Sequence, residues 1–189
     1  MQGGHKLLDL GCSLAQDLRK LVYDGAPAQR LTGLELEQGF LDLGYDLFRD
    51  RETFAAKLVS GDFFERRIKG LKDRSFDIIH AAAFFHLFSW DDQAELMRHA
   101  LRLLKPKSGS MIFGMQNAVD EPGVLRHPAT RAGEVYRHND ASFEKLVLSV
   151  AKRDKLQVDC HAAMEEVAAQ RRVKLVADAK VLRFCITIR

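Results

Sequence analysis

The sequence predicts an α/β fold in which helices cover both faces of a mostly parallel sheet. Short apolar segments alternate with helical patterns over the first 116 residues, and turn residues bound each segment. Apolar runs of this length are typical of strands that are buried on both faces. Strands that alternate with helices need right-handed crossovers, which build a parallel sheet. The five expected strands span residues 6–10, 30–36, 56–60, 76–81 and 110–115.

Three helical patterns lie between these strands. Ser13 and Gln16 have the spacing of a capping box, so we expect the first helix to begin at Ser13 and to stop before residues 24–27. Ser89 is expected to begin the third helix, and Pro106 lies just beyond its end. The second helix is expected over residues 38–48, where four apolar side chains fall near one face: Phe40, Leu43, Leu47 and Phe48.

The pattern changes after residue 116. Residues 117–140 are expected to form a long polar loop, and loops of that length in a compact domain are usually functional or mobile. A helix is expected to resume over residues 142–150, followed by strands over residues 156–161 and 180–188. The last strand alternates between two sets of side chains, which favours an antiparallel strand near the edge of the sheet.

The composition indicates an ordinary globular protein. With 189 residues, of which 47% are hydrophobic and 29% charged, the default expectation is one domain over residues 1–189. No apolar run approaches the roughly 20 residues that span a bilayer, and the first residues lack the pattern of a signal peptide. Three widely spaced cysteines without a CxxC motif favour reduced thiols and a cytoplasmic location.

The net charge of +3 is unevenly distributed. Residues 151–189 carry nine basic and five acidic side chains, whereas residues 1–150 carry 20 and 21. A basic tail is a weak sign of nucleic-acid binding. Here the charges are scattered among apolar residues, without a basic block or the aromatic side chains that stack on bases. We therefore expect neither nucleic acid nor a membrane as a partner.

The strongest functional signal is a glycine turn followed by an acid. The first expected strand ends at Gly11, and the second ends at Glu35. Strand, glycine turn, helix, strand and acid is the order of a nucleotide-binding unit, in which the acid holds both hydroxyls of a ribose. A dinucleotide turn has the pattern GxGxxG, but here only Gly11 is glycine, with Ser13 and Ala15 at the next alternate positions, which disfavours NAD and FAD. The alternatives are that Gly11 merely ends a strand and that Glu35, like its neighbour Glu37, is a surface acid.

Further candidates follow the third and fourth strands. Asp62 is suited to accept a hydrogen bond from an adenine amino group while Phe63 packs on the base; the alternative is a helix cap beside a core ring. Small residues after the fourth strand permit a ligand to approach closely, and His86 then lies at the carboxyl edge of the sheet. His86 is suited to act as a general base, although a structural role is more common for such a histidine.

The polar loop carries cationic and titratable side chains. His127, Arg131 and His138 are suited to grip an acidic acceptor, and solvated side chains are the equal alternative. The seven histidines show neither HxxxH nor HExxH spacing, so no metal site is expected.

An ordered series of motifs resembles the class I S-adenosylmethionine-dependent methyltransferases. The series covers residues 5–116 in the order of that family: Leu7-Leu8-Asp9-Leu10-Gly11-Cys12, Gly33-Leu34-Glu35, Gly61-Asp62-Phe63, Phe76-Asp77-Ile78-Ile79 and Leu103-Leu104-Lys105-Pro106. Residues 44–51, 85–90 and 112–116 look like segments of small fungal methyltransferases of polyketide and meroterpenoid pathways, several of which methylate a carboxyl or hydroxyl oxygen. The resemblance implies a Rossmann-like sheet of seven strands. It also implies a cofactor-binding half over residues 5–116 and an acceptor-side loop and strands over residues 117–189.

The resemblance also implies roles for single residues. The methionine part of S-adenosylmethionine would lie against Asp9, Gly11, Cys12 and Ser13. The ribose would bind Glu35, the adenine would lie between Asp62 and Phe63, and the sulfonium would lie near Ala81 and Ala82. The acceptor side would comprise Phe85, Trp90, Gln116, His127, Arg131 and His138, with His86 as the candidate catalytic residue.

Two departures from the family are visible. Ser13 and Ala15 replace the second and third glycines of its GxGxG turn. The family normally has helices ahead of the first strand, which residues 1–4 cannot form, so we expect a core without the N-terminal lid helices. The sequence leaves open whether a homodimer supplies the missing cover.

Three functions therefore remain in order of preference. The first is O-methylation of a carboxyl or hydroxyl group on a small molecule of secondary metabolism, with S-adenosylmethionine as the methyl donor. The second is a non-catalytic remnant or partner subunit, motivated by the missing lid. The third is an NAD-dependent reductase, which the altered glycine turn disfavours.

Overall fold

The computed structural model describes residues 4–166 and 180–189. It contains a seven-stranded sheet, a two-stranded sheet and four α-helices within that part of the chain. In chain order the strands and helices are β1 (Leu7–Leu10), α1 (Gln16–Tyr23), β2 (Leu31–Glu35), α2 (Gln38–Phe48), β3 (Lys57–Ser60), β4 (Ile78–His80), α3 (Trp90–Leu103), β5 (Met111–Ala118), β6 (Gly123–Arg126), β7 (Glu134–Arg137), α4 (Asp140–Arg153), β8 (Val158–Glu166) and β9 (Lys180–Ile188).

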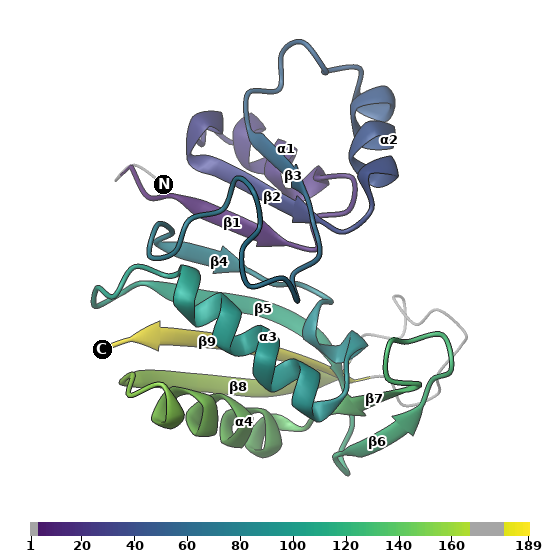
Figure 1. The fold of residues 1–189 in the computed structure, drawn as a ribbon, viewed down its shortest axis with the longest axis vertical. Coiled ribbons are helices and arrows are strands. Elements are labelled where there is room, and N and C mark those ends of the chain that lie inside the picture. The colour runs from purple at the N-terminus through teal and green to yellow at the C-terminus, as the bar shows by residue number, and fades with distance from the viewer. Residues whose placement is uncertain (1–3, 167–179) are drawn as a thin grey trace.

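The expected α/β fold is confirmed (Figure 1). The strand order in the large sheet is β3-β2-β1-β4-β5-β9-β8. The first five strands of this order are parallel to one another. As expected, the last strand, β9, is antiparallel to its neighbours, and it lies one place in from the edge, which β8 forms. The order reverses between β1 and β4, and open α/β sheets bind ligands at such a switch point.

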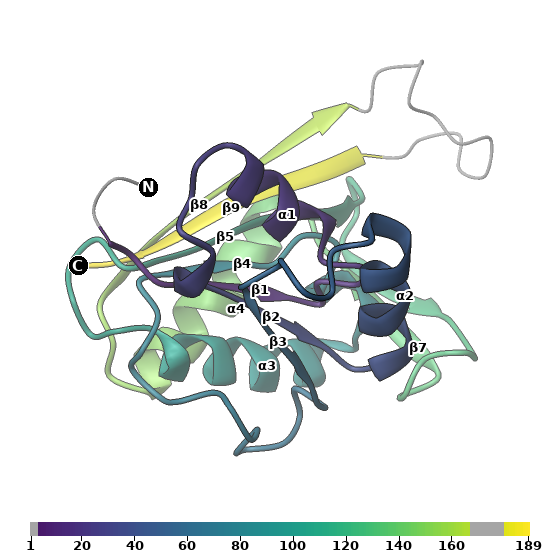
Figure 2. The same ribbon diagram turned by 90° about the horizontal axis from the view of Figure 1, so that it is seen from above.

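Helices lie on both faces of the large sheet (Figure 2). Leu18 of α1 and Leu41 of α2 pack with Leu7 and Leu31 on one face. The other face carries α3 and α4, whose buried side chains join the larger core cluster with Leu8 and Leu10 of β1. Neighbouring residues of β1 thus enter different cores, as the alternation of side chains along a strand requires.

The predicted capping box at Ser13 is wrong. Helix α1 begins at Gln16, and its N-cap residue is Ala15, which has no side-chain cap. Ser13 itself has a φ of 49°, and its backbone N–H donates to the carboxylate of Glu35. The turn after β1 therefore continues to Ala15, because its backbone groups bond to β2 instead of starting the helix.

The second helix has the expected bounds, but the apolar face named above does not enter the core. Leu41 and Gly44 are its buried residues. A Cβ atom at Gly44 would lie 2.6 Å from the backbone oxygen of Leu14, so α2 approaches the rest of the fold through its smallest side chain. Phe40, Leu43 and Leu47 are exposed instead.

The expected polar loop over residues 117–140 is largely structured. Strand β5 continues to Ala118, and β6 and β7 form an antiparallel hairpin. The hairpin is anchored to the segment before α3, since Tyr136 N–H donates to the carbonyl of Phe88 at 2.9 Å. The sequence signal for these strands was Val124-Leu125 in β6 and Val135-Tyr136 in β7, since such residues favour strands. The nearby Pro122 and Pro128 favoured the prediction of a loop instead.

No helix among residues 4–166 and 180–189 has the length and apolarity that a bilayer crossing requires.

Candidate active site

A cleft of about 560 Å³ opens at the carboxyl ends of β1 to β4. Its walls include Gly11 after β1, Glu35 at the end of β2 and Asp62 after β3. These are the three elements that the sequence predicted to hold a nucleoside. The volume falls in the range of about 300–1,000 Å³ that small-molecule sites occupy. The structure therefore gathers four of the cofactor candidates, Gly11, Glu35, Asp62 and Phe63, at the place where this kind of sheet binds ligands.

The glycine turn is held close to β2. The N–H groups of Gly11 and Cys12 both donate to the carbonyl of Leu34, at 2.9 and 3.0 Å. Gly11 has a φ of +67°, and a Cβ atom there would lie 3.0 Å from the ring of Phe84. A side chain would meet this ring at the floor of the cleft, which explains why glycine is needed here.

The turn has left-handed backbone at all three glycine positions of the family pattern, although only the first of them is glycine. Gly11, Ser13 and Ala15 have φ values of 67°, 49° and 53°, all in the left-handed region. These are the three positions at which the GxGxG pattern has glycine. Ser13 and Ala15 thus adopt a conformation that costs non-glycine residues of order 1–3 kcal/mol each. The two substitutions therefore add strain to the turn.

Glu35 is fixed by two backbone donors. Its Oε2 accepts from Ser13 N–H at 2.8 Å, and its Oε1 accepts from Glu37 N–H at 3.2 Å. Each carboxylate oxygen has further lone pairs, so the side chain can accept two more hydrogen bonds. Glu37 is exposed at the amino end of α2, so of the two neighbouring acids the structure brings Glu35 to the cleft.

Asp62 and Phe63 meet at the other end of the cleft. Oδ1 of Asp62 accepts from Phe64 N–H at 2.9 Å, which orients the carboxylate. Phe63 is largely buried, and its ring packs edge-on against Phe84, with 5.8 Å between ring centroids. No helix begins at Asp62, so the helix cap considered from the sequence is absent here, whereas Phe63 does join the core. Both residues line the cleft, and their role toward adenine stays a prediction.

Of the small residues after β4, Ala83 reaches the cleft. Its φ is 51°, and its N–H donates to the carbonyl of Met115. Ala81 is fully buried under Gly114, and Ala82 is half-buried. Cys12 is also buried, with its sulfur against Gly33. The roles expected for Ala81, Ala82 and Cys12 stay predictions.

Asp9 makes a contact that the sequence did not reveal. It is buried, and its Oδ1 lies 2.8 Å from Nδ1 of His80. Burial raises the pKa of Asp9 against the effect of His80, while the hydrogen bond to Asp9 raises the pKa of His80. With Asp17, these side chains are one group among the described residues whose ligand atoms could converge on a metal ion. Histidine spacing could not reveal this grouping, because His80 meets Asp9 across neighbouring strands.

His86 lies in a short 3-10 turn, η2 (Phe85–Leu87), and is almost completely buried. Its Nδ1 has no hydrogen-bond partner. Burial, with a smaller contribution from the nearby Arg137 guanidinium, lowers the pKa of His86 to about 4. Arg137 also donates to the backbone carbonyl of His86 at 2.7 Å, so β7 holds this turn in place. The imidazole is therefore neutral at neutral pH.

Of the other predicted acceptor-side residues, Phe85 and His138 are buried, and Trp90 is half-buried against the core. Phe85 is fully buried and packs on Phe84 and Phe184. His138 is also fully buried, with its Nδ1 at 2.9 Å from the hydroxyl of Ser142. Its ring packs on Trp90, with 5.3 Å between the centroids. None of these three residues is among the walls of the cleft, and Phe85 and His138 are shielded from solvent.

Gln116 is a polar residue in an apolar setting. It lies on β5 and is only 2% exposed, and neither atom of its amide has a hydrogen-bond partner. Burying an amide without a hydrogen-bond partner destabilises the fold by several kcal/mol, which is at least the free energy of one lost hydrogen bond. Such a side chain calls for a polar partner, which the residues around it do not provide.

The tip of the hairpin reaches the cleft. His127 and Arg131 line it together with Phe64, and the Arg131 guanidinium lies 4.0 Å from the centroid of the Phe64 ring. His127 N–H donates to the carbonyl of Gly133, and Thr130 N–H donates to that of His127. These bonds order the turn, so Arg131 is a cation placed at the mouth of the cleft.

The sequence reasoning missed the aromatic and aliphatic wall of the site. Leu36, Phe84, Leu87 and Phe88 line the cleft with Phe64. The signal for them was the apolar run around His86, which continues past the fourth strand without any strand or helix pattern.

The chain belongs to the methyltransferase domain family, whose profile matches residues 7–107. This is the class of protein that the switch-point cleft, the glycine turn and Glu35 indicate.

Among individual relatives, the chain is 44% identical over 154 residues to the O-methyltransferase phiE of a fungal species, covering 80% of this chain and 51% of the relative. It is 45% identical over 113 residues to the asnovolin E/chermesin D methyltransferase nvfJ of Aspergillus novofumigatus, covering 59% and 41%. The chain spans about half the length of the curated relatives it matches.

Solved structures support the fold. One similar structure is a phosphoethanolamine N-methyltransferase 2 of Haemonchus contortus, in complex with phosphomonomethylethanolamine and S-adenosylhomocysteine. It has a TM-score of 0.73 at 13% identity and covers 100% of this chain and 49% of its own. Another is the [4+2]-cyclase SpnF, with a TM-score of 0.68 at 17% identity and a coverage of 98% and 76%. A cyclase among the neighbours shows that the fold does not by itself define the reaction.

Proposed function

We propose that this protein is an S-adenosylmethionine-dependent methyltransferase that transfers a methyl group to an oxygen of a small molecule. The observation that carries the proposal is Glu35, whose carboxylate is fixed at the end of β2 beside the close-approach turn at Gly11. Such a carboxylate accepts hydrogen bonds from the two hydroxyl groups of a ribose. Membership of the methyltransferase domain family supports the same cofactor.

The residues present fit this cofactor. Glu35 would hold the ribose, and Asp62 with Phe63 would hold the adenine, since all three line one cleft. The backbone at Gly11 and Ser13 would border the methionine part. Ala81 and Ala82 remain our proposal for the sulfonium region, and Ala83, which lines the cleft, joins them.

The bound cofactor supplies a methyl group that is already activated on a sulfonium. The protein's own contribution is alignment of the acceptor oxygen behind that methyl group and exclusion of water, and such positioning alone can accelerate a reaction by many orders of magnitude. The aromatic wall formed by Phe84 and Phe88 serves the exclusion of water. The transfer itself needs no nucleophilic side chain of the protein, because the acceptor oxygen attacks the methyl group directly.

We propose a carboxyl or hydroxyl group as the acceptor. The names of the fungal relatives support methyl transfer to small metabolites, and that of phiE supports oxygen. Within this site, Arg131 and His127 at the mouth of the cleft are suited to a carboxylate. Gln116 is buried and lies outside the cleft walls, but both of its amide atoms are unpartnered, so we propose it as a further partner for a hydroxyl or carbonyl oxygen.

The role of His86 depends on the acceptor. A carboxylate is already ionised and needs no base, whereas a hydroxyl has to lose its proton. We propose His86 as the proton acceptor for hydroxyl substrates only, because its Nδ1 is unpartnered. Its pKa of about 4 and its burial outside the cleft walls count against this role, since an efficient base has a pKa near the working pH.

The second candidate function is a non-catalytic partner that binds cofactor. The observation in its favour is the altered glycine turn, in which Ser13 and Ala15 adopt left-handed conformations at positions where the family has glycine. The two candidates differ in turnover and share cofactor binding.

We also propose that the protein is located in the cytoplasm, which the three free cysteines support.

Methyl transfer is tested with a labelled donor and a panel of aromatic carboxylic acids and phenols. The full-length phiE O-methyltransferase serves as a positive control for the assay. Labelled methyl ester or ether formed by the 189-residue chain supports the enzyme. Binding of S-adenosylhomocysteine without any labelled product would contradict the enzyme and favour the non-catalytic partner.

A further inference from the structure

Helix α2 carries two separate apolar faces. One face packs on the protein's own body through Leu41 and Gly44. The other faces solvent, where Phe40, Leu43 and Leu47 are 47%, 53% and 61% exposed. Spacings of three and four residues bring these side chains onto one narrow stripe of the helix.

The exposed stripe continues to the cleft. Leu36 comes just before α2, is 59% exposed and lines the cofactor cleft. Leu36, Phe40, Leu43 and Leu47 together follow the alternating four-and-three spacing that seams of paired helices have. Single exposed apolar residues are common on monomers, but a continuous stripe marks an interaction surface.

We propose that a second copy of this chain covers the stripe, with the two α2 helices antiparallel across a twofold axis. A twofold interface requires a surface that is complementary to itself. An axis that passes beside Leu43 brings Phe40 of each copy level with Leu47 of the other. The large rings then alternate with the smaller leucines along the seam, and each copy buries the same side chains.

The charges at the ends of α2 favour this orientation. Glu37 is exposed at the amino end, and Arg49 and Arg51 are exposed at the carboxyl end. In an antiparallel pair the acidic end of one helix lies beside the basic end of the other, and the helix dipoles also oppose each other. A parallel pair would bring Arg49 against Arg49. Arg51 already pairs with Asp42 and Asp46 of its own chain, at 3.4 and 3.5 Å, so Arg49 is the cation that the interface would use.

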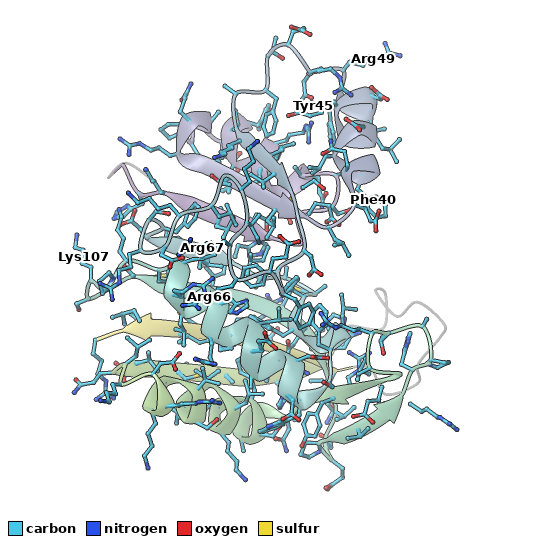
Figure 3. All side chains as sticks on the ribbon, viewed as in Figure 1. Phe40, Tyr45, Arg49, Arg66, Arg67 and Lys107 are labelled. Carbon is cyan, nitrogen blue, oxygen red and sulfur yellow. The ribbon has the colours of Figure 1, made fainter. Side chains whose placement is uncertain are left out.

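The position of α2 leaves room for the second copy. Figure 1 places α2 at the outer boundary of the molecule, and the side chains of Phe40 and Arg49 point outward from it (Figure 3). A pair of 11-residue helices is smaller than a standard interface. We therefore expect a dimer with a dissociation constant in the micromolar range.

Sedimentation velocity of the 189-residue chain over about 1–200 µM tests the proposal, since this range brackets a micromolar constant. The expected result is a monomer that converts to a dimer as the concentration rises. Leu43→Glu should weaken the dimer by at least about tenfold, the size of an interface position that contributes to binding. Leu148→Glu is the matched control, because Leu148 is 48% exposed on α4, away from the stripe. Far-ultraviolet circular dichroism checks that both variants fold.

A charge exchange tests the orientation. Glu37→Arg and Arg49→Glu should each weaken self-association, and an equimolar mixture of the two should form a mixed dimer more readily than either variant alone. A wild-type chain that stays monomeric at every concentration would overturn the proposal, and cosedimentation of that monomer with lipid vesicles would assign the stripe to a membrane surface. A dimer that Leu43→Glu leaves intact would also overturn it.

Discussion

Two buried histidines should make the folded protein lose stability between pH 7 and pH 5. Burial lowers the pKa of both His86 and His138 to about 4, whereas an exposed histidine in the unfolded chain titrates near 6.5. The unfolded chain therefore binds these protons first, and stability falls as the pH drops from about 6.5 to about 4. At pH 5 each histidine lowers the free energy of unfolding by about 2 kcal/mol relative to pH 7.

Urea unfolding at pH 7 and pH 5 measures this effect. Other groups also titrate in this window, including His80, whose raised pKa acts in the opposite direction. His86→Gln and His138→Gln isolate the two contributions, because each variant should lose about 2 kcal/mol less than the wild type between the two pH values. His127→Gln is the control, since His127 is exposed. Equal losses in the wild type and both core variants would refute the reasoning that these imidazoles are held neutral by burial.

Three further substitutions test the site and its support. Glu35→Ala should weaken binding of S-adenosylhomocysteine by about 1–3 kcal/mol in a calorimetric titration, the scale of a charged hydrogen-bonding partner; an equal loss in Glu37→Ala and none in Glu35→Ala would move the ribose role to Glu37. Ser13→Gly should stabilise the fold by about 0.5–1 kcal/mol in urea unfolding, because it relieves a left-handed residue; the same change at Ser60, in β3, should destabilise it. Arg19→Ala should lower stability by about 3 kcal/mol or more, since it leaves Asp50 without its paired donors at 2.7 and 2.9 Å; a loss below 1 kcal/mol would mean that this ion pair is not structural.

The parts of the fold that follow from local pattern could be predicted from the sequence. The strands that lead to Gly11 and Glu35 are short apolar runs bounded by turns, and such runs specify buried parallel strands. The parallel sheet then brings the ends of those strands to one edge, so Gly11, Glu35 and Asp62 meet without any knowledge of side-chain contacts. The helix over residues 38–48 was predicted with its observed bounds.

The parts that depend on contacts between distant elements could not be predicted. His138 is polar in type, but it is buried because β7 pairs with β6 and carries it against Trp90 and Phe143. The exposed stripe of α2 has the same periodicity as a core face, and only the close approach at Gly44 decides which face is buried. The turn at Ser13 was mistaken for a helix cap because its partner, Glu35, lies on another strand. Periodicity identifies an apolar face but not the element that covers it.

Calorimetric titration of the 189-residue chain with S-adenosylhomocysteine, beside NADH, tests the central claim most directly. The glycine turn, Glu35 and Asp62 predict binding of S-adenosylhomocysteine at one site and no binding of NADH. Binding of NADH without S-adenosylhomocysteine would contradict the account and identify the cleft as a dinucleotide site.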